Sequence, residues 1–140
     1  MKVKIKKIHP NAIIPQYAKP GDAGLDLVAV TKIEHTDLIE YGTGLAIEIP
    51  EGYVGLIFPR SSIKNYEVSL TNSVGVVDAG YRGEIKAFFR KHSSPICRHY
   101  EVLERIAQLV IIPIPTIELE QVEYLSDSER GTGGYGSTGI

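Results

Sequence analysis

The chain has 140 residues, the size of a single domain, with 43% apolar and 23% charged residues. This composition can build a core and argues against both disorder and membrane insertion. The net charge of −2 excludes the broad basic surface of a duplex-binding protein, so we expect no direct nucleic-acid partner. The single cysteine, Cys97, cannot form an internal disulfide and fits a reducing compartment. We therefore expect a cytoplasmic protein, in the host cytoplasm if a virus or phage encodes it.

Short runs rich in β-branched residues recur along the chain, separated by glycine and proline. Their alternating apolar positions are typical of half-buried strands. Residues 50–53, Pro-Glu-Gly-Tyr, predict a tight turn between two of these runs. Regular short strands with turns between them predict an all-β sandwich, jelly roll or barrel. The expected strands are residues 3–8, 44–49, 53–58, 74–77, 84–89 and 109–114.

Two segments have helical character. Residues 100–110 place apolar side chains at positions 103, 106, 107 and 110, the spacing of an amphipathic helix. The β-branched, proline-ended continuation to Pro115 favours a strand for the same segment. After Arg60 we expect a helical turn or two, with Ser61 or Ser62 as its N-cap.

The last stretch differs in composition, because residues 130–139 hold five glycines. Glycine adds no packing surface and is the residue that loses most backbone entropy on ordering. We therefore expect a folded domain over residues 1–125 and a flexible tail over residues 126–140. The tail matches G-x-G-x-x-G at 131–136, but too few residues follow for the helix and acidic residue of a dinucleotide site.

The tail nevertheless has the groups that bind phosphate. Backbone N–H groups, the Arg130 guanidinium and the hydroxyls of Ser137 and Thr138 can surround a phosphate chain. Tyr135 offers a ring on which a base can stack. The alternative interpretation is a disordered Gly/Ser tail without a ligand.

Two motifs follow predicted strands. Residues 59–62, Pro-Arg-Ser-Ser, place an arginine and two hydroxyls at the start of a short helical turn, which can form an anion site. The alternative is a capped surface helix with a solvated arginine. Residues 75–83 place Asp78 between two glycines at a strand end, where it can take a proton from water. Tyr81 beside it can pack against a sugar. The alternative is an ordinary turn aspartate.

Two more motifs place polar residues in apolar surroundings. Asp26 lies inside the apolar run 23–27, so it needs a partner or a metal-bound water, unless it points to solvent at a strand edge. In residues 104–108, Arg105 and Gln108 have apolar neighbours and can also serve to bond backbone groups. The histidines and the cysteine show no zinc-ligand spacing.

In this order, residues 23–27, 59–62, 75–83, 104–108 and 130–139 resemble the five motifs of the trimeric dUTPase family. The resemblance implies a jelly-roll-like β-barrel that forms a homotrimer with three active sites between subunits. It implies hydrolysis of dUTP to dUMP and pyrophosphate with Mg²⁺, which keeps uracil out of DNA and supplies dUMP for dTMP synthesis. It gives no reason to expect a membrane partner.

The resemblance also implies individual roles. Asp78 is the general base for water attacking the α-phosphorus, and Tyr81 packs under the deoxyribose and excludes a ribose hydroxyl. Asp26 contacts the metal through water, Asn72 lies in the uracil-reading hairpin, and Tyr135 lies on the uracil. The residues implied to bind substrate are Arg60, Ser61, Ser62, Asn72, Gly75, Tyr81, Gln108, Arg130, Gly133, Gly134, Tyr135, Gly136, Ser137 and Thr138.

The chain departs from the family pattern at two positions. Leu103 stands where the fourth motif usually has glycine, and Tyr135 replaces the commoner phenylalanine. Two other functions remain open. The related dCTP deaminase family shares the Arg-Ser-Ser element, but it resembles a chain with a catalytic glutamate where Phe88 stands here. A nucleotide-gated binding module, whose tail reports bound dUTP to a protein partner, is the non-enzymatic alternative.

Overall fold

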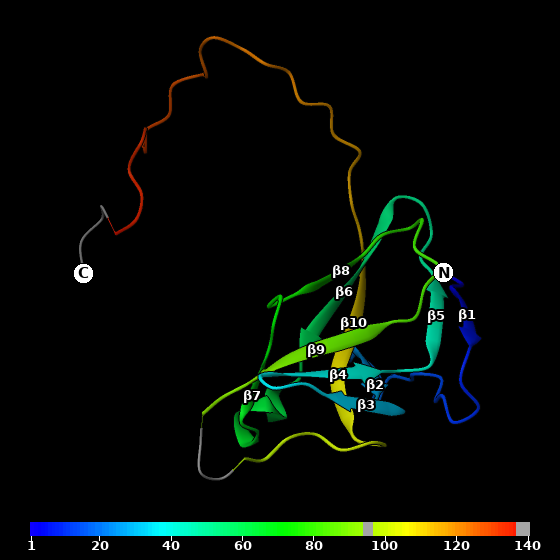
Figure 1. Ribbon diagram of the computed structural model, residues 1–140. Helices are drawn as coiled ribbons and strands as arrows, with labels where there is room; N and C mark the ends of the chain where they lie inside the picture. Colours follow the sequence, from blue (N-terminus) through cyan, green and yellow to red (C-terminus); the bar gives the residue numbers. More distant parts are fainter. Residues whose placement is uncertain (94–96, 137–140) are drawn as a thin grey trace.

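The computed structural model describes residues 1–93 and 97–136 (Figure 1). The predicted all-β class is confirmed, and no helix among these residues is long and apolar enough to cross a membrane. The elements are β1 (Lys4–Lys7), β2 (Leu25–Val28), β3 (Thr31–Glu34), β4 (Leu38–Gly42), β5 (Leu45–Glu48), β6 (Tyr53–Pro59), the 3₁₀ turn η1 (Ser61–Asn65), β7 (Val68–Leu70), β8 (Gly75–Val77), β9 (Lys86–Lys91) and β10 (Arg105–Pro113).

The strands form three antiparallel sheets. Their orders are β1-β5, β2-β10-β6-β8 and β3-β4-β9-β7. The inner faces of the two four-stranded sheets share one core, which includes Leu27, Ile57 and Leu109 from one sheet and Ile39, Tyr41 and Phe89 from the other. No strand pairing in the described part of the chain closes these sheets into a barrel, so the predicted barrel closure is wrong. Their edge strands have only three or four residues, and the sheets meet through side chains instead.

The strands predicted from alternation are confirmed as β1, β5, β6, β8, β9 and β10. Residues 100–115 carried both a helical and a strand pattern. From Arg105 on they form the strand β10, which pairs with β2 on one side and β6 on the other. Pairing on both edges and burial of Ile106, Ala107 and Leu109 outweigh the helical spacing. The predicted helical turn is η1, but its N-cap is Arg60 and makes no side-chain cap hydrogen bond. The serine N-cap prediction is therefore wrong.

A tight turn leads into β10 and carries the first departure from the family pattern. The Glu104 N–H donates to the Glu101 carbonyl oxygen at 3.1 Å, and Leu103 has a φ of 72°. This left-handed conformation crowds Cβ against the backbone in every residue except glycine. The Leu103 side chain is exposed, so no packing offsets the strain.

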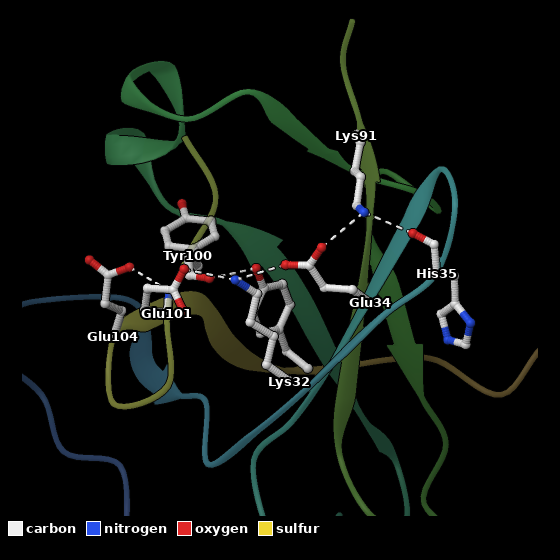
Figure 2. Close-up of polar contacts among 8 residues, drawn as sticks. Lys32, Glu34, His35, Lys91, Tyr100, Glu101 and Glu104 are labelled. Carbon is white, nitrogen blue, oxygen red and sulfur yellow. Dashed lines mark hydrogen bonds and ion pairs between the residues drawn. The ribbon is translucent and has the colours of Figure 1, made fainter. Parts of the chain in front are cut away.

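The same turn is tied to β3 by Lys32 (Figure 2). The Lys32 ammonium donates to Glu101 at 2.8 Å and lies 3.2 Å from Glu34. Burial pushes the pKa of Lys32 down, but its hydrogen bonds with the two carboxylates raise the pKa above its ordinary value. Glu34 also pairs with Lys91 at 3.1 Å, so the contacts run across β3 to β9.

We predict that Leu103→Gly stabilises the fold. Relief of the left-handed strain, about 1–2 kcal/mol, exceeds the added unfolded-state entropy of glycine, about 0.5–1 kcal/mol. The free energy of unfolding in urea should rise by about 0.5–1 kcal/mol. Val102→Gly is the matched control, because Val102 precedes it in the same turn without a positive φ and should lose stability. A Leu103→Gly variant less stable than the parent would contradict the strain argument.

Candidate functional site

One sheet carries residues of all four internal motifs. Asp26 lies on β2 directly opposite Gln108 on β10. Arg60 and Ser61 follow β6, the next strand, and Asp78 follows β8 at the sheet edge. Strand order in the sheet differs from chain order, so hydrogen-bonded pairing brings together motifs that are far apart in sequence.

The first cleft has a volume of about 310 Å³ and is called here the arginine cleft. The side chains that define it are those of Asp26, Arg60, Ser61, Arg105 and Gln108. Two guanidinium groups face the Asp26 carboxylate, and the Asp22 carboxylate also lines the cleft. Because a guanidinium offers planar, paired donors, this cleft suits an oxygen-rich anion such as phosphate.

Asp26 holds both arginines. Arg60 donates from Nε to Oδ1 at 2.7 Å and from Nη2 to Oδ2 at 3.3 Å, and Arg105 donates from Nη1 to Oδ2 at 3.1 Å. The Asp26 and Arg60 side chains are only 21% and 24% exposed. Of the two interpretations of Asp26, the one with a partner is confirmed. Arg105 was absent from the predicted site residues, although it lies in the 104–108 motif.

Gln108 lines another side of the cleft, and Ser62 lies behind Arg60. The Gln108 Nε2 donates to the Pro59 carbonyl oxygen at 3.0 Å, and its amide lies against Gly24, where an added Cβ would overlap the amide oxygen. The absence of a side chain at Gly24 therefore leaves room for the Gln108 amide. Ser62 does not line this cleft, and its Oγ accepts a hydrogen bond from Arg60 Nη1 at 3.1 Å.

No group of three or more His, Cys, Asp or Glu side chains that could hold a metal ion occurs in the described ranges 1–93 and 97–136. Asp26 is the carboxylate closest to the arginines, and both its oxygens already accept their hydrogen bonds. Mg²⁺ commonly keeps several waters and takes ligands from substrate phosphates. The donor set thus fits an ion held mainly by substrate and water.

The second cleft, about 420 Å³, is called here the tyrosine cleft. Asn72, Gly75, Asp78, Tyr81 and Phe88 are among its lining residues. Asp78 is exposed to solvent there, so its carboxylate is accessible to a water molecule. The cleft combines that carboxylate with an aromatic ring, which suits a nucleoside carrying a reactive group.

The Tyr81 ring is held in place from two sides. The Tyr81 backbone N–H donates to the Asp78 carbonyl oxygen at 3.0 Å, and the hydroxyl at the end of the ring donates to the Glu84 carbonyl oxygen at 3.0 Å. A Cβ added at Gly83 would overlap the Tyr81 hydroxyl. Because Gly83 has no side chain, it leaves the space into which the end of the Tyr81 ring fits.

The predicted site residues fall into separate groups. No described residue lines both the arginine cleft and the tyrosine cleft. The described tail residues line neither cleft, and in Figure 1 the tail runs away from the sheets. Arg130 Nε donates instead to the Gly133 carbonyl oxygen at 2.7 Å, and Tyr135 is exposed. The predicted Ser137 and Thr138 lie outside the described residues.

Comparison with known proteins identifies the family. The dUTPase family model matches residues 10–139. The deoxyuridine 5'-triphosphate nucleotidohydrolases of Picosynechococcus sp. and Nautilia profundicola are each 44% identical to this chain. Each alignment covers 99% of this chain and 99% of the relative. The chain therefore belongs to the dUTPase family.

Solved structures agree with this assignment. The dUTPase of Staphylococcus bacteriophage 80alpha, solved with dUpNHpp, has a TM-score of 0.86 and 32% identity over 99% of both chains. A mutant dUTPase of the S. aureus phage phi11 has a TM-score of 0.76 and 28% identity, covering 89% of this chain and 98% of its own. That phage structure is described as revealing the coordination of a structural Mg(II) ion.

We predict that Gly83→Ala weakens binding of dUTP. The new methyl group displaces the Tyr81 ring, and misplacement of a contact group by about 1 Å costs up to 10²-fold, so we expect a rise in KM of at least about tenfold. Steady-state kinetics checks this. Gly80→Ala is the matched control, since its Cβ would meet nothing within 4 Å. Equal KM values for the two variants would mean that the ring does not touch the nucleotide.

Proposed function

We propose that this protein hydrolyses dUTP to dUMP and pyrophosphate, with water attacking the α-phosphorus. Membership of the dUTPase family over residues 10–139 carries the proposal. The two clefts support it, because one suits phosphate and the other suits a nucleoside beside an accessible carboxylate. In a cytoplasmic setting the reaction would keep uracil out of DNA and supply dUMP for dTMP synthesis.

The arginine cleft would bind the phosphates. Phosphoryl transfer depends mainly on positioning and on neutralising charge that spreads over the phosphate oxygens. Arg60 and Arg105 supply that charge from a geometry already set by Asp26, so little reorganisation is needed on binding. Ser61 and Gln108 add polar groups at the same cleft.

The tyrosine cleft would bind the nucleoside and carry the base. Asp78 takes the proton of the attacking water, a role that requires a carboxylate within hydrogen-bond reach of that water. Tyr81 packs under the deoxyribose and leaves no room for a ribose 2′-hydroxyl. Asn72 and Gly75 border the same cleft and would bind uracil.

A single chain keeps the two halves apart, which supports active sites shared between subunits of a homotrimer. β8 pairs with β6 so that Val77, next to Asp78, lies opposite Gly55. Arg60 is five residues further along the chain, about 17 Å at 3.3 Å per residue. One triphosphate cannot bring its α-phosphorus to Asp78 and its phosphates to Arg60 of the same chain across that distance.

The segment after β10 supports the same assembly. It has large apolar side chains that are 70–89% exposed in one chain, those of Ile117, Leu119, Tyr124 and Leu125. Such exposure calls for a covering surface, which a second copy would supply. We propose that residues 1–125 form the folded unit and that residues 126–140 order over bound triphosphate. Ordering at that moment would exclude water from the site.

Mg²⁺ is the proposed cofactor. When bound, it would neutralise phosphate charge, with phosphate oxygens and water as its ligands and Asp26 in contact with that water. This chain's own residues bind the phosphates, orient Asp78 and hold the Tyr81 ring.

Pyrophosphate release from dUTP, dTTP, dCTP and UTP tests the proposal, and we expect efficient release from dUTP alone. Asp78→Asn should lower turnover about 10²- to 10⁴-fold, the range for a lost general base, while dUTP binding changes little. Asp37→Asn, at an exposed pair with Arg90, is the control and should keep full turnover.

Two outcomes would contradict this function. Ammonia released from dCTP would indicate a deaminase, although Phe88 stands in the tyrosine cleft where that chemistry would need a glutamate. Tight dUTP binding without pyrophosphate release would indicate the binding module. Unchanged turnover in Asp78→Asn would refute the assigned base.

We also predict that deletion of residues 130–140 leaves an assembled protein with severely reduced dUTP turnover. The described tail residues contribute nothing to the shared core, but the tail would supply contacts to the γ-phosphate. Sedimentation should give a mass near three chains for both forms. Normal hydrolysis by the truncated protein would disprove the role of the tail, and an active monomer would disprove the shared-site arrangement.

A further inference from the structure

The Tyr100 side chain is fully buried, yet its hydroxyl has no hydrogen-bond partner among the described residues. Buried polar groups are almost always paired, because an unpaired one loses its hydration without compensation. Phenylalanine would fill the same space without that loss. The hydroxyl therefore calls for a partner that is not in place in the free chain.

Three aromatic rings fix the direction of this hydroxyl. Tyr66 stacks on the Tyr100 ring at 3.8 Å between centroids, and Phe89 and Tyr41 contact it at 5.5 and 6.3 Å. The Tyr41 hydroxyl donates to the Tyr100 carbonyl oxygen at 2.8 Å. In Figure 2 the Tyr100 hydroxyl points away from Lys32 and toward the helical turn η1. Burial raises the pKa of Tyr100, so its hydroxyl stays protonated and able to donate at neutral pH.

Ser62, on η1, is the polar side chain on that side. A hydrogen-bonding contact with the Ser62 hydroxyl acts to lower the pKa of Tyr100, as the Arg60 charge also does, which places both groups near the phenol, although the Ser62 contact falls short of a complete hydrogen bond. Ser62 Oγ accepts from Arg60 Nη1 at 3.1 Å, while Nε and Nη2 of the same guanidinium face Asp26. Nη1 also donates to the Arg105 carbonyl oxygen at 3.5 Å, so both of its acceptors are neutral and it is the Arg60 nitrogen that an incoming anion can draw away.

We propose that Tyr100 is a positioning residue for the arginine cleft, acting through Ser62. When a phosphate takes the hydrogen bond of Arg60 Nη1, the Tyr100 hydroxyl donates to Ser62 Oγ in its place. Ser62 stays fixed at the start of η1, and its own hydroxyl hydrogen is free for the anion. This inference rests on the proposed binding of dUTP phosphates at Arg60.

Tyr100→Phe tests the inference with the full-length protein. The ring is kept and an unpaired buried hydroxyl is removed, so the midpoint of urea unfolding should not fall. The KM for dUTP should rise about fivefold, as for one lost neutral hydrogen bond, with kcat changed less than about twofold. A merely structural role for Tyr100 would give the opposite pattern, with lower stability and an unchanged KM.

Tyr66→Phe is the matched control. It removes a hydroxyl from the stacked neighbour, which donates to Glu104 at 3.0 Å rather than facing Ser62. Its KM should equal that of the parent. Ser62→Ala should raise KM as Tyr100→Phe does, and the double variant should be no worse than Ser62→Ala, because both act through one hydrogen bond.

An unchanged KM in Tyr100→Phe, or additive effects in the double variant, would overturn the inference. Arg60→Gln separates this failure from failure of the proposed site. Loss of dUTP binding in Arg60→Gln with a normal Tyr100→Phe would reject the role of Tyr100 alone. Normal binding in Arg60→Gln would reject both the phosphate site and the inference built on it.

Discussion

The arginine cleft depends on the pairing of Asp26 with Arg60 and Arg105. These residues come from β2, the end of β6 and the start of β10, so one carboxylate joins three strands. Because Asp26 and Arg60 are largely buried, solvent screens their attraction less than it would at the surface. Without the carboxylate the two guanidinium groups would repel each other. The pairing therefore keeps both guanidinium groups in place before any anion arrives.

Two motif glycines serve this site by lacking a side chain. Gly24 leaves room for the Gln108 amide, and Gly83 leaves room for the end of the Tyr81 ring. Neither has a positive φ, so the need is for space rather than for an unusual backbone. Leu103 is the reverse case, because its turn requires a left-handed residue and the chain supplies one with a side chain.

Much of the fold could be predicted from alternation, and the missed strands show where alternation fails. β3 and β4 carry charged residues such as Lys32 and Glu34, whose partners Lys91 and Glu101 are distant in sequence. A local pattern cannot show that such charges are paired across strands, so the sequence does not predict strands for these segments. For the site, the motifs pointed to Asp26, but not to Arg105 as its second partner.

The sequence by itself determined the all-β class, the order of the five motifs and the residue types able to bind a nucleotide. These follow from local patterns, since strand alternation and turn chemistry are read over a few neighbouring residues. Only the tertiary structure decided that Asp26 holds two arginines, that Ser62 bonds Arg60 and that Asp78 lies in a different cleft. Strand register and sheet order set these relations, and both depend on contacts between segments far apart in the chain.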